Sequence, residues 1–273
     1  MLIEYLSVSR VNTFNTCPQQ YKFKYHDKVK SDIPEPEYFT FGNIVHKIAE
    51  KYVKNQGKDS LNEIANQILK GDIPLNEYNG KQTFAPALSA EYKKKLPKHL
   101  EAIQRLTKKV GFDGETEYKF QYALDNNHRL FTGVIDRLIK KESKLWIIDY
   151  KSTRSGKFRK DEKSIIHDIQ LRSYARVVQR EFNVDAGNIQ VALYYLDPPS
   201  KLVAAKFSNK TLIETEKELL NTYKIIESTD PKKVWGKTGI HCNYCEFKNM
   251  CAFFKNVNKK QPIEKKLYTL GLV

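Results

Sequence analysis

Three charged residues near the middle of the chain have the types and spacing of a phosphate-ester-cleaving site. Asp136 lies in the run GVIDR at 133–137, and Asp149 and Lys151 lie in the run IIDYK at 147–151. Two carboxylates can hold a divalent metal ion, and a lysine beside them can stabilise the charge that builds on a phosphate under attack. The three residues therefore predict a site that hydrolyses phosphodiester bonds.

The segment between the two runs predicts how these residues meet. Residues 140–144 are polar and the runs on either side are β-branched and apolar, which indicates a β-hairpin. With the turn centred near Glu142, Asp136 falls opposite Ile148 and one residue from Asp149. Small shifts of register keep both carboxylates within reach of one cation. Asp149 and Lys151, two residues apart, share one face of their strand.

The ordinary alternative for this pair is a solvated salt bridge on an exposed strand. Trp146, Ile147 and Ile148 indicate instead that the strand is buried. Burying charged groups is costly unless they are paired or hold a metal. The pattern therefore favours a site.

Composition limits the classes of partner. The 273 residues contain 47 Lys+Arg against 32 Asp+Glu, a net charge of +15, and 40% are hydrophobic. This favours a globular protein with a polyanionic partner such as nucleic acid, although a generally lysine-rich composition would also give the excess. No 18-residue apolar run and no signal-peptide pattern is present, so we expect a soluble, cytoplasmic protein with no membrane partner.

The four cysteines predict a second metal centre. Cys242, Cys245 and Cys251 form C-x2-C-x5-C, and Cys17 stands alone near the N-terminus. In an intracellular protein this spacing favours metal over disulfides. The asymmetric spacing favours an iron–sulfur cluster, while His241 keeps a mixed-ligand zinc site open. Either centre would join the two ends of the chain.

Hydrophobic periodicity predicts an α/β (α+β) chain with no repeats and no long linker. We expect helices at 10–24 (capped by Ser9), 40–54, 61–110 (interrupted at 71–86 and at Pro97), 164–182 and 209–226, and strands at 115–124, 129–139, 145–151, 189–196 and 202–207. We interpret this as one domain, with an N-terminal helix at 1–30, a helical region at 40–112, a core at 113–230, a cysteine-bearing segment at 235–256 and a basic tail at 257–273.

Taken in order, these pieces resemble the RecB-like branch of the PD-(D/E)XK nuclease superfamily. The matching segments are LSVSR at 6–10, CPQQY at 17–21, GNIVH at 42–46, EYKF at 117–120, GVID at 133–136, DYK at 149–151 and QLRSY at 170–174. The C-x2-C-x5-C with Cys17 is similar to the iron–sulfur staple of AddB and of CRISPR-associated nucleases. The resemblance implies a central mixed β-sheet with flanking helices, a restriction-endonuclease-like core, a helical insertion and a C-terminal iron–sulfur segment.

The resemblance also implies roles for individual residues. Mg²⁺ or Mn²⁺ would be held by His46, Asp136, Asp149 and the backbone carbonyl of Tyr150, and a 4Fe-4S cluster by Cys17, Cys242, Cys245 and Cys251. Lys151 would orient the attacking water or stabilise the phosphate. Gln170 and Tyr174 would contact the scissile strand. Glu117 would act at most through water, and we leave it outside the catalytic set.

The function expected from these observations is a metal-dependent deoxyribonuclease, most simply a single-stranded DNA exonuclease in recombination or repair. The lysine-rich stretch 93–109 would track the phosphate backbone, and Phe131, Tyr150 and Tyr174 would stack on bases. No phosphate-binding loop of an ATPase is present, so a helicase or other recombination protein would be a separate partner. The alternatives are a non-catalytic iron–sulfur nucleic-acid-binding module and a structure-specific endonuclease.

Overall fold

The computed structural model describes residues 1–31, 33–78, 80–152 and 159–254, so the predicted basic tail lies outside the described residues. The chain divides into two compact units. The terminal unit comprises Met1–Glu35, Gln121–Gly133 and Glu214–Val273, and the central unit comprises Pro36–Phe120 and Val134–Ile213. Each unit is described by itself below. The prediction of a single domain stays a prediction.

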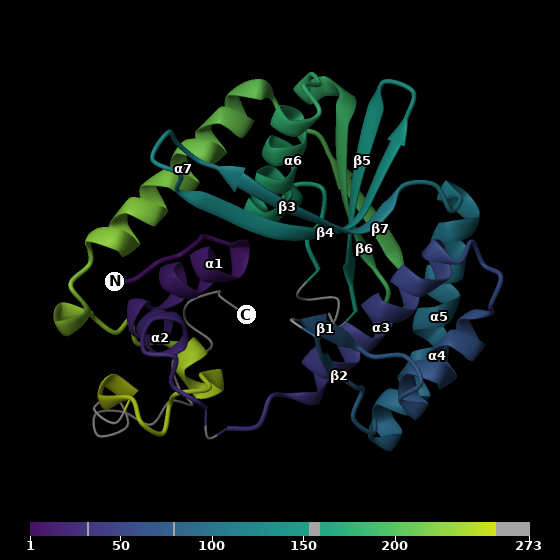
Figure 1. The fold of residues 1–273 in the computed structure, drawn as a ribbon, viewed down its shortest axis with the longest axis horizontal. Helices are drawn as coiled ribbons and strands as arrows, with labels where there is room; N and C mark the ends of the chain where they lie inside the picture. The colour runs from purple at the N-terminus through teal and green to yellow at the C-terminus, as the bar shows by residue number, and fades with distance from the viewer. Residues whose placement is uncertain (32, 79, 153–158, 255–273) are drawn as a thin grey trace. The chain divides into compact units, whose positions relative to one another are not determined.

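A five-stranded mixed sheet, most of it in the central unit, confirms the predicted fold class (Figure 1). Its strands, in spatial order, are β3 (Glu115–Ala123), β4 (Leu130–Lys141), β5 (Lys144–Lys151), β6 (Ile189–Tyr195) and β7 (Lys201–Ala205). β4 and β5 are antiparallel, β5 and β6 parallel, and β6 and β7 antiparallel. The parallel pair is possible because a long connection, including a helix, joins β5 to β6.

The predicted hairpin is present, but its register was wrong by one residue. Arg137, not Asp136, pairs with Ile148, and Lys141 pairs with Lys144 across a two-residue turn. The turn residue Glu142 has a positive φ of 54°, as such tight turns require. If the register is continued by one residue, Asp136 falls opposite Asp149.

Three helices pack together against one face of the sheet in the central unit: α3 (Glu37–Lys54), α4 (Leu61–Lys70) and α5 (Ala90–Val110). Their apolar faces share one core with Ile148 and Tyr150 of β5 and Tyr194 of β6. The predicted interruption at 71–86 holds a small hairpin, β1 (Asn76–Tyr78) and β2 (Lys81–Thr83). The predicted break at Pro97 was wrong, because α5 runs through it. Buried Leu96, Leu100 and Ile103 keep this helix in the core, which offsets the lost hydrogen bond.

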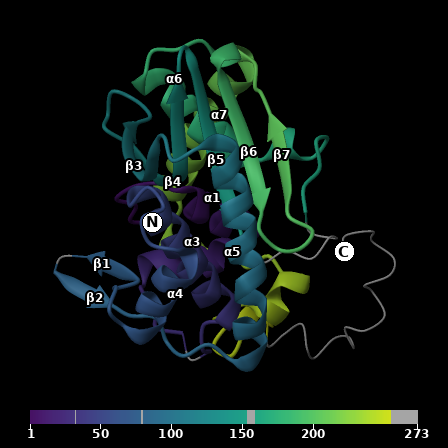
Figure 2. The same cartoon turned by 90° about the vertical axis from the view of Figure 1, so that its right-hand side faces the viewer.

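Helix α6 (Ile169–Glu181) lies against β5 and β6 (Figure 2). It begins later than the predicted 164, after a 3-10 turn at Ile165–His167, because the Asp168 side chain caps it by accepting the Leu171 N–H at 3.0 Å. Ile148 and Tyr150 face the α3–α5 core, so Asp149 between them points to the other face, towards α6.

The terminal unit begins with α1 (Val8–Thr16), α2 (Pro18–Tyr21) and a π-helical turn (Lys22–His26). The single predicted helix at 10–24 was wrong, because Pro18 forces Cys17 into an extended conformation that separates α1 from α2. The cap is Ser7 rather than Ser9. Helix α7 (Asn209–Ser228) starts in the central unit and continues into the terminal unit. Among the described residues, no helix has the length and apolar character needed to cross a membrane.

Candidate active site

The site is built where strands β4 and β5 stop pairing. The ladder ends at Arg137 and Ile148, and beyond it the Asp136 carboxylate accepts the Tyr150 backbone N–H at 2.6 Å. A side chain thus takes the acceptor position that a strand carbonyl would otherwise supply. The Asp136 carboxylate of β4 is therefore held beside Asp149, the residue before Tyr150 on β5.

Helix α3 brings His46 to this point. His46 Nδ1 lies 3.3 Å from Asp136 Oδ1. Gly42, one turn earlier on α3, permits the approach, because a Cβ atom there would lie 3.0 Å from Ser152 Oγ at the end of β5. The predicted metal ligands His46 and Asp136 are therefore neighbours.

A third side chain that could bind a metal, Glu117 of β3, lies beside them. One ligand atom each from His46, Glu117 and Asp136 lie within 4.8 Å of one another. Glu117 has a φ of 53°, a left-handed conformation that costs about 1–3 kcal/mol in a residue with a side chain. The sequence analysis left Glu117 outside the catalytic set, and its strained backbone beside two ligands argues for including it.

Asp149 lies next to this group and is held by groups of its own. Lys151 Nζ is 2.6 Å from Asp149 Oδ2, and Gln170 Nε2 donates to Asp149 Oδ1 at 2.7 Å. Lys151 also donates to Gln170 Oε1 at 3.0 Å, and Gln170 donates to the Tyr174 hydroxyl at 3.1 Å. Gln170 and Tyr174, one turn apart on α6 as predicted, thus lie behind the acid and the lysine, and their predicted contact with the scissile strand stays a prediction.

The close carboxylates perturb one another's protonation. Burial lowers the pKa of His46, but the adjacent Asp136 carboxylate outweighs burial and raises that pKa to about 9. Burial and the Asp136 charge raise the pKa of Glu117 to about 7. Burial raises the pKa of Asp149 to about 6, with Lys151 opposing and Asp136 adding to the shift. Near neutral pH the site therefore holds protons that a divalent cation would displace.

The donor set fits a hard divalent cation. It consists of carboxylate oxygens and one imidazole, which suit Mg²⁺ or Mn²⁺. Asp149 Oδ2 is buried, and the Lys151 ammonium lies 2.6 Å from it. A carboxylate oxygen can accept from more than one partner, so this oxygen keeps capacity beyond the ion pair. A buried oxygen with this spare capacity can serve as a metal ligand.

The predicted base-stacking role of three aromatic residues was wrong. Phe131, Tyr150 and Tyr174 are 0%, 4% and 5% exposed. Tyr174 packs edge-on against Phe120, and Tyr150 packs edge-on against His46. A ring buried in this way cannot receive a nucleobase on its face.

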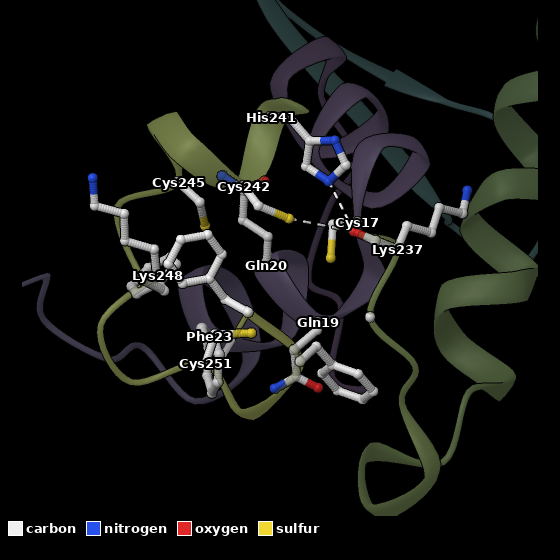
Figure 3. A pocket seen from close by; sticks show the side chains of 14 residues that line it. Cys17, Gln19, Gln20, Phe23, Lys237, His241, Cys242, Cys245, Lys248 and Cys251 are labelled. Carbon is white, nitrogen blue, oxygen red and sulfur yellow. Dashed lines mark hydrogen bonds between the residues drawn. The ribbon is translucent and has the colours of Figure 1, made fainter. Parts of the chain in front are cut away.

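A second candidate centre lies in the terminal unit. Cys17, Cys242, Cys245 and Cys251 line one pocket, and all four are free thiols (Figure 3). Burial raises the pKa of Cys242 and Cys245, and the Cys17 thiol nearby adds to the shift. Thiols that resist ionisation become good ligands once a metal supplies the compensating charge.

The two ends of the chain build this pocket together. The extended Cys17 between α1 and α2 supplies one thiol, and the segment after α7 supplies three. Lys24 forms an ion pair with Glu246 at 2.7 Å, and Lys237 Nζ donates to the Asn15 carbonyl at 2.8 Å. These contacts hold the C-terminal segment against the N-terminal helices.

The chain is similar to several known proteins. A family model described as the PD-(D/E)XK nuclease superfamily matches residues 5–252. The chain is similar to a subunit of the ATP-dependent helicase/deoxyribonuclease of Streptococcus agalactiae serotype III (strain NEM316), with 26% identity over 237 residues, 84% of this chain and 21% of that relative. It thus spans about a fifth of the relative's length. Similar solved structures are a candidate exonuclease from Eubacterium rectale (TM-score 0.49, 14% identity, 98% of this chain and 94% of that one) and a protein described as SSO0001 (TM-score 0.39, 16% identity, 78% and 84%).

Proposed function

Because the chain belongs to the PD-(D/E)XK nuclease superfamily, we propose that it is a metal-dependent deoxyribonuclease that degrades single-stranded DNA from a free end. The observation that carries this proposal is the meeting of Asp136, Asp149 and Lys151 beside His46. Structural ion pairs alone do not require a buried carboxylate, Asp149, to gather with three half-buried ionisable groups at one place. A metal-dependent site that cleaves phosphodiesters does use clustered carboxylates with a basic side chain beside them.

Each residue has a role in this proposal. His46, Asp136, Asp149 and the Tyr150 carbonyl hold Mg²⁺ or Mn²⁺, with Glu117 as a further ligand. The ion, when bound, supplies positive charge to the phosphate and lowers the pKa of water. Lys151 places a second positive charge where the phosphoryl oxygens develop charge.

Gln170 fixes the geometry, because its amide contacts both Asp149 and Lys151. Tyr174 in turn accepts from Gln170. We assign both residues to the side of the site where the DNA strand to be cut would lie, since they are on the face of β5 that carries Asp149 and Lys151.

The substrate and partners follow from charge and from the relative. A net charge of +15 suits a phosphate backbone, and all six lysines of α5 are exposed (Lys93, Lys94, Lys95, Lys98, Lys108 and Lys109). The Streptococcus relative is named as part of a helicase/deoxyribonuclease. We therefore propose a helicase or another recombination protein as the partner that supplies single strands.

For the cysteine pocket we propose a 4Fe-4S cluster. Among the described residues, one group of His, Cys, Asp or Glu side chains has three potential ligand atoms within 4.8 Å of one another, and it is formed by His46, Glu117 and Asp136. No three of the four cysteine sulfurs therefore lie within 4.8 Å of one another. Four sulfurs around one zinc would lie about 3.8 Å apart, given a Zn–S distance of about 2.3 Å and tetrahedral angles. The wider spacing favours a larger group, and thiolates are the usual ligands of such clusters.

The test of the activity uses end-labelled single- and double-stranded DNA with Mg²⁺, Mn²⁺ or EDTA. We expect linear single strands to be degraded with either metal and preserved in EDTA. Asp149→Ala and Lys151→Ala should abolish cleavage. Asp149→Ala should also leave the melting temperature within a few degrees, since removing one of two adjacent acids relieves repulsion. Full activity in Asp149→Ala would overturn the assignment.

Circular single-stranded DNA tests the requirement for an end. An exonuclease leaves the circle intact, whereas cleavage of the circle as fast as the linear strand would establish an endonuclease in its place. DNA binding without cleavage of any substrate would establish a non-catalytic binding module.

The cluster is tested by anaerobic purification. We expect a brown protein with a broad absorbance shoulder at about 400 nm, typical of thiolate-bound iron. Cys17→Ser should lose iron and solubility, because Cys17 joins distant parts of the chain. Stoichiometric zinc without iron would contradict the proposal.

A further inference from the structure

A preference for single-stranded DNA needs exposed aromatic rings that can stack on unpaired bases, and Tyr150 and Tyr174 are buried. Another pair of aromatic side chains is exposed. Tyr38 and Phe39, in the first turn of α3, are 42% and 51% exposed. Their ring centroids are 4.5 Å apart with planes inclined by 35°. Exposing two large aromatic side chains side by side leaves apolar area in water that a ligand could cover.

We propose that Tyr38 and Phe39 form a stacking platform for an unpaired base of the substrate strand. This inference rests on the proposed nuclease function, because it identifies how the same site would select single strands. Base–aromatic stacking is tolerant of sequence and unavailable to bases inside a duplex. A platform of this kind therefore separates single-stranded from double-stranded substrates.

The position of the pair on α3 links it to the metal ligands. Phe39 precedes His46 by seven residues, so the two side chains leave the helix on nearly the same face. The distance along the axis is about 10 Å, which corresponds to about three nucleotides at duplex spacing and fewer in an extended strand. Between them, Asn43 is exposed and Gly42 adds no side chain, so the face is not blocked by a bulky group.

Basic side chains lie at the same end of the helical layer. Helices α3 and α5 begin together, because the Ser89 N–H donates to the Glu37 carboxylate at 2.6 Å. Tyr92, in the first turn of α5, packs on Phe41 with centroids 4.9 Å apart. Lys93 and Lys94, next in sequence to Tyr92, are exposed.

Two acidic residues at this end, Glu37 and Glu91, are already engaged. Glu37 accepts from Ser89, and Glu91 is paired with Lys95 at 2.5 Å. Lys93 and Lys94 are therefore available to phosphates while the rings receive a base, the combination found in sequence-independent single-strand binders.

The experiment measures DNA binding by the full chain carrying Asp149→Asn, so that cleavage does not interfere. The probes are a linear single strand, the same strand with abasic sites in place of bases near its end, and a duplex. Phe39→Ala and Tyr38→Ala should each weaken single-strand binding about ten-fold and leave duplex binding unchanged. Phe39→Trp should restore the affinity, which a merely structural role would not predict.

Phe84→Ala is the matched control. Phe84 is 49% exposed but lies outside α3, so its removal should leave single-strand binding unchanged. Abasic strands should bind the protein with intact rings weakly and show no further loss in Phe39→Ala. Equal losses on intact and abasic strands, or losses matched by Phe84→Ala, would overturn the platform.

The same measurements separate this inference from the function on which it rests. Cleavage by the protein with an intact Asp149, combined with unaltered single-strand binding in Phe39→Ala, removes the platform and keeps the nuclease. Absence of both cleavage and binding removes the nuclease and the platform together.

Discussion

The Asp136 carboxylate accepts the backbone N–H of Tyr150 at 2.6 Å, so a side chain of β4 completes the hydrogen bonding of β5. The same carboxylate lies 3.3 Å from His46 Nδ1. It therefore performs a structural and a ligand role at once. These two roles can be separated by substitution.

Asp136→Ala should lose both roles, whereas Asp136→Asn should lose one. The alanine leaves the Tyr150 N–H without its acceptor, which costs about 1–3 kcal/mol of unfolding free energy. The asparagine retains an oxygen for that N–H but carries no charge for a metal. We expect both variants to be inactive and only the alanine to be clearly destabilised in urea unfolding. Equal stability of the two would contradict the structural role.

Gln170 offers a test of positioning. Its amide donates to Asp149 and accepts from Lys151. Gln170→Leu removes these two bonds and the bond to Tyr174 at similar volume, so Lys151 keeps only its ion pair with Asp149 and is less well oriented. We expect kcat to fall about 10- to 100-fold with little change in KM, as misplacement of a catalytic group predicts. Gln179→Leu, the same change on the same helix away from Asp149, is the control and should retain full activity.

Local patterns in the sequence were sufficient to predict the hairpin and the shared face of Asp149 and Lys151. Alternation of apolar residues along 147–151 placed Asp149 and Lys151 on one face, and the polar turn predicted the hairpin. The register failed by one residue, because it depends on how many residues the turn contains and on the positive φ of Glu142. Local composition does not contain that information.

Glu117 illustrates a second limit. Its side chain joins His46 and Asp136 only because its backbone takes a φ of 53° within a strand. In a regular strand, successive side chains point to alternate faces of the sheet. The sequence of β3 does not indicate that Glu117 breaks this alternation. The exposed state of Tyr38 and Phe39 was equally hidden, since both lie in an amphipathic helix beside buried Phe41.

Gly114 should be among the least replaceable glycines of the central unit. It has a φ of +93°, and a Cβ atom there would lie 2.4 Å from the Leu138 carbonyl oxygen. Gly114→Ala should cost about 2–5 kcal/mol by combining left-handed strain with overpacking. Gly80, with a φ of +74° and open space around it, is the matched control. Gly80→Ala should cost about 1–2 kcal/mol of unfolding free energy in the same urea titration. An equal cost for the two substitutions would mean that the contact between a Cβ atom at position 114 and the Leu138 carbonyl oxygen adds nothing to the destabilisation.

His99 gives the stability of the central unit a dependence on pH. This buried side chain of α5 has Nδ1 3.0 Å from the Lys95 carbonyl, and Nε2 lies 2.7 Å from the Ser152 carbonyl and 3.2 Å from Asp197 Oδ1. Carbonyl and carboxylate oxygens only accept, so both ring nitrogens must carry protons. Burial lowers the pKa of His99, but the bonds to Asp197 and to the two carbonyls outweigh burial and raise it above the ordinary value.

The sign of the effect follows from linkage. A folded-state pKa above the unfolded value of about 6.5 means that the folded chain binds the proton more tightly. The stabilisation is complete below about pH 6.5 and is lost as pH rises through the folded pKa, at about 1.4 kcal/mol for each unit between the two pKa values. We expect the difference in unfolding free energy between the unsubstituted protein and His99→Gln to shrink as the pH rises from about 6.5 through the folded-state pKa of His99. The titrations of Glu117 and Asp149 are present in both proteins and cancel in that difference. A difference that does not change with pH would mean that His99 is neutral when folded, with one ring nitrogen facing a carbonyl without a proton between them.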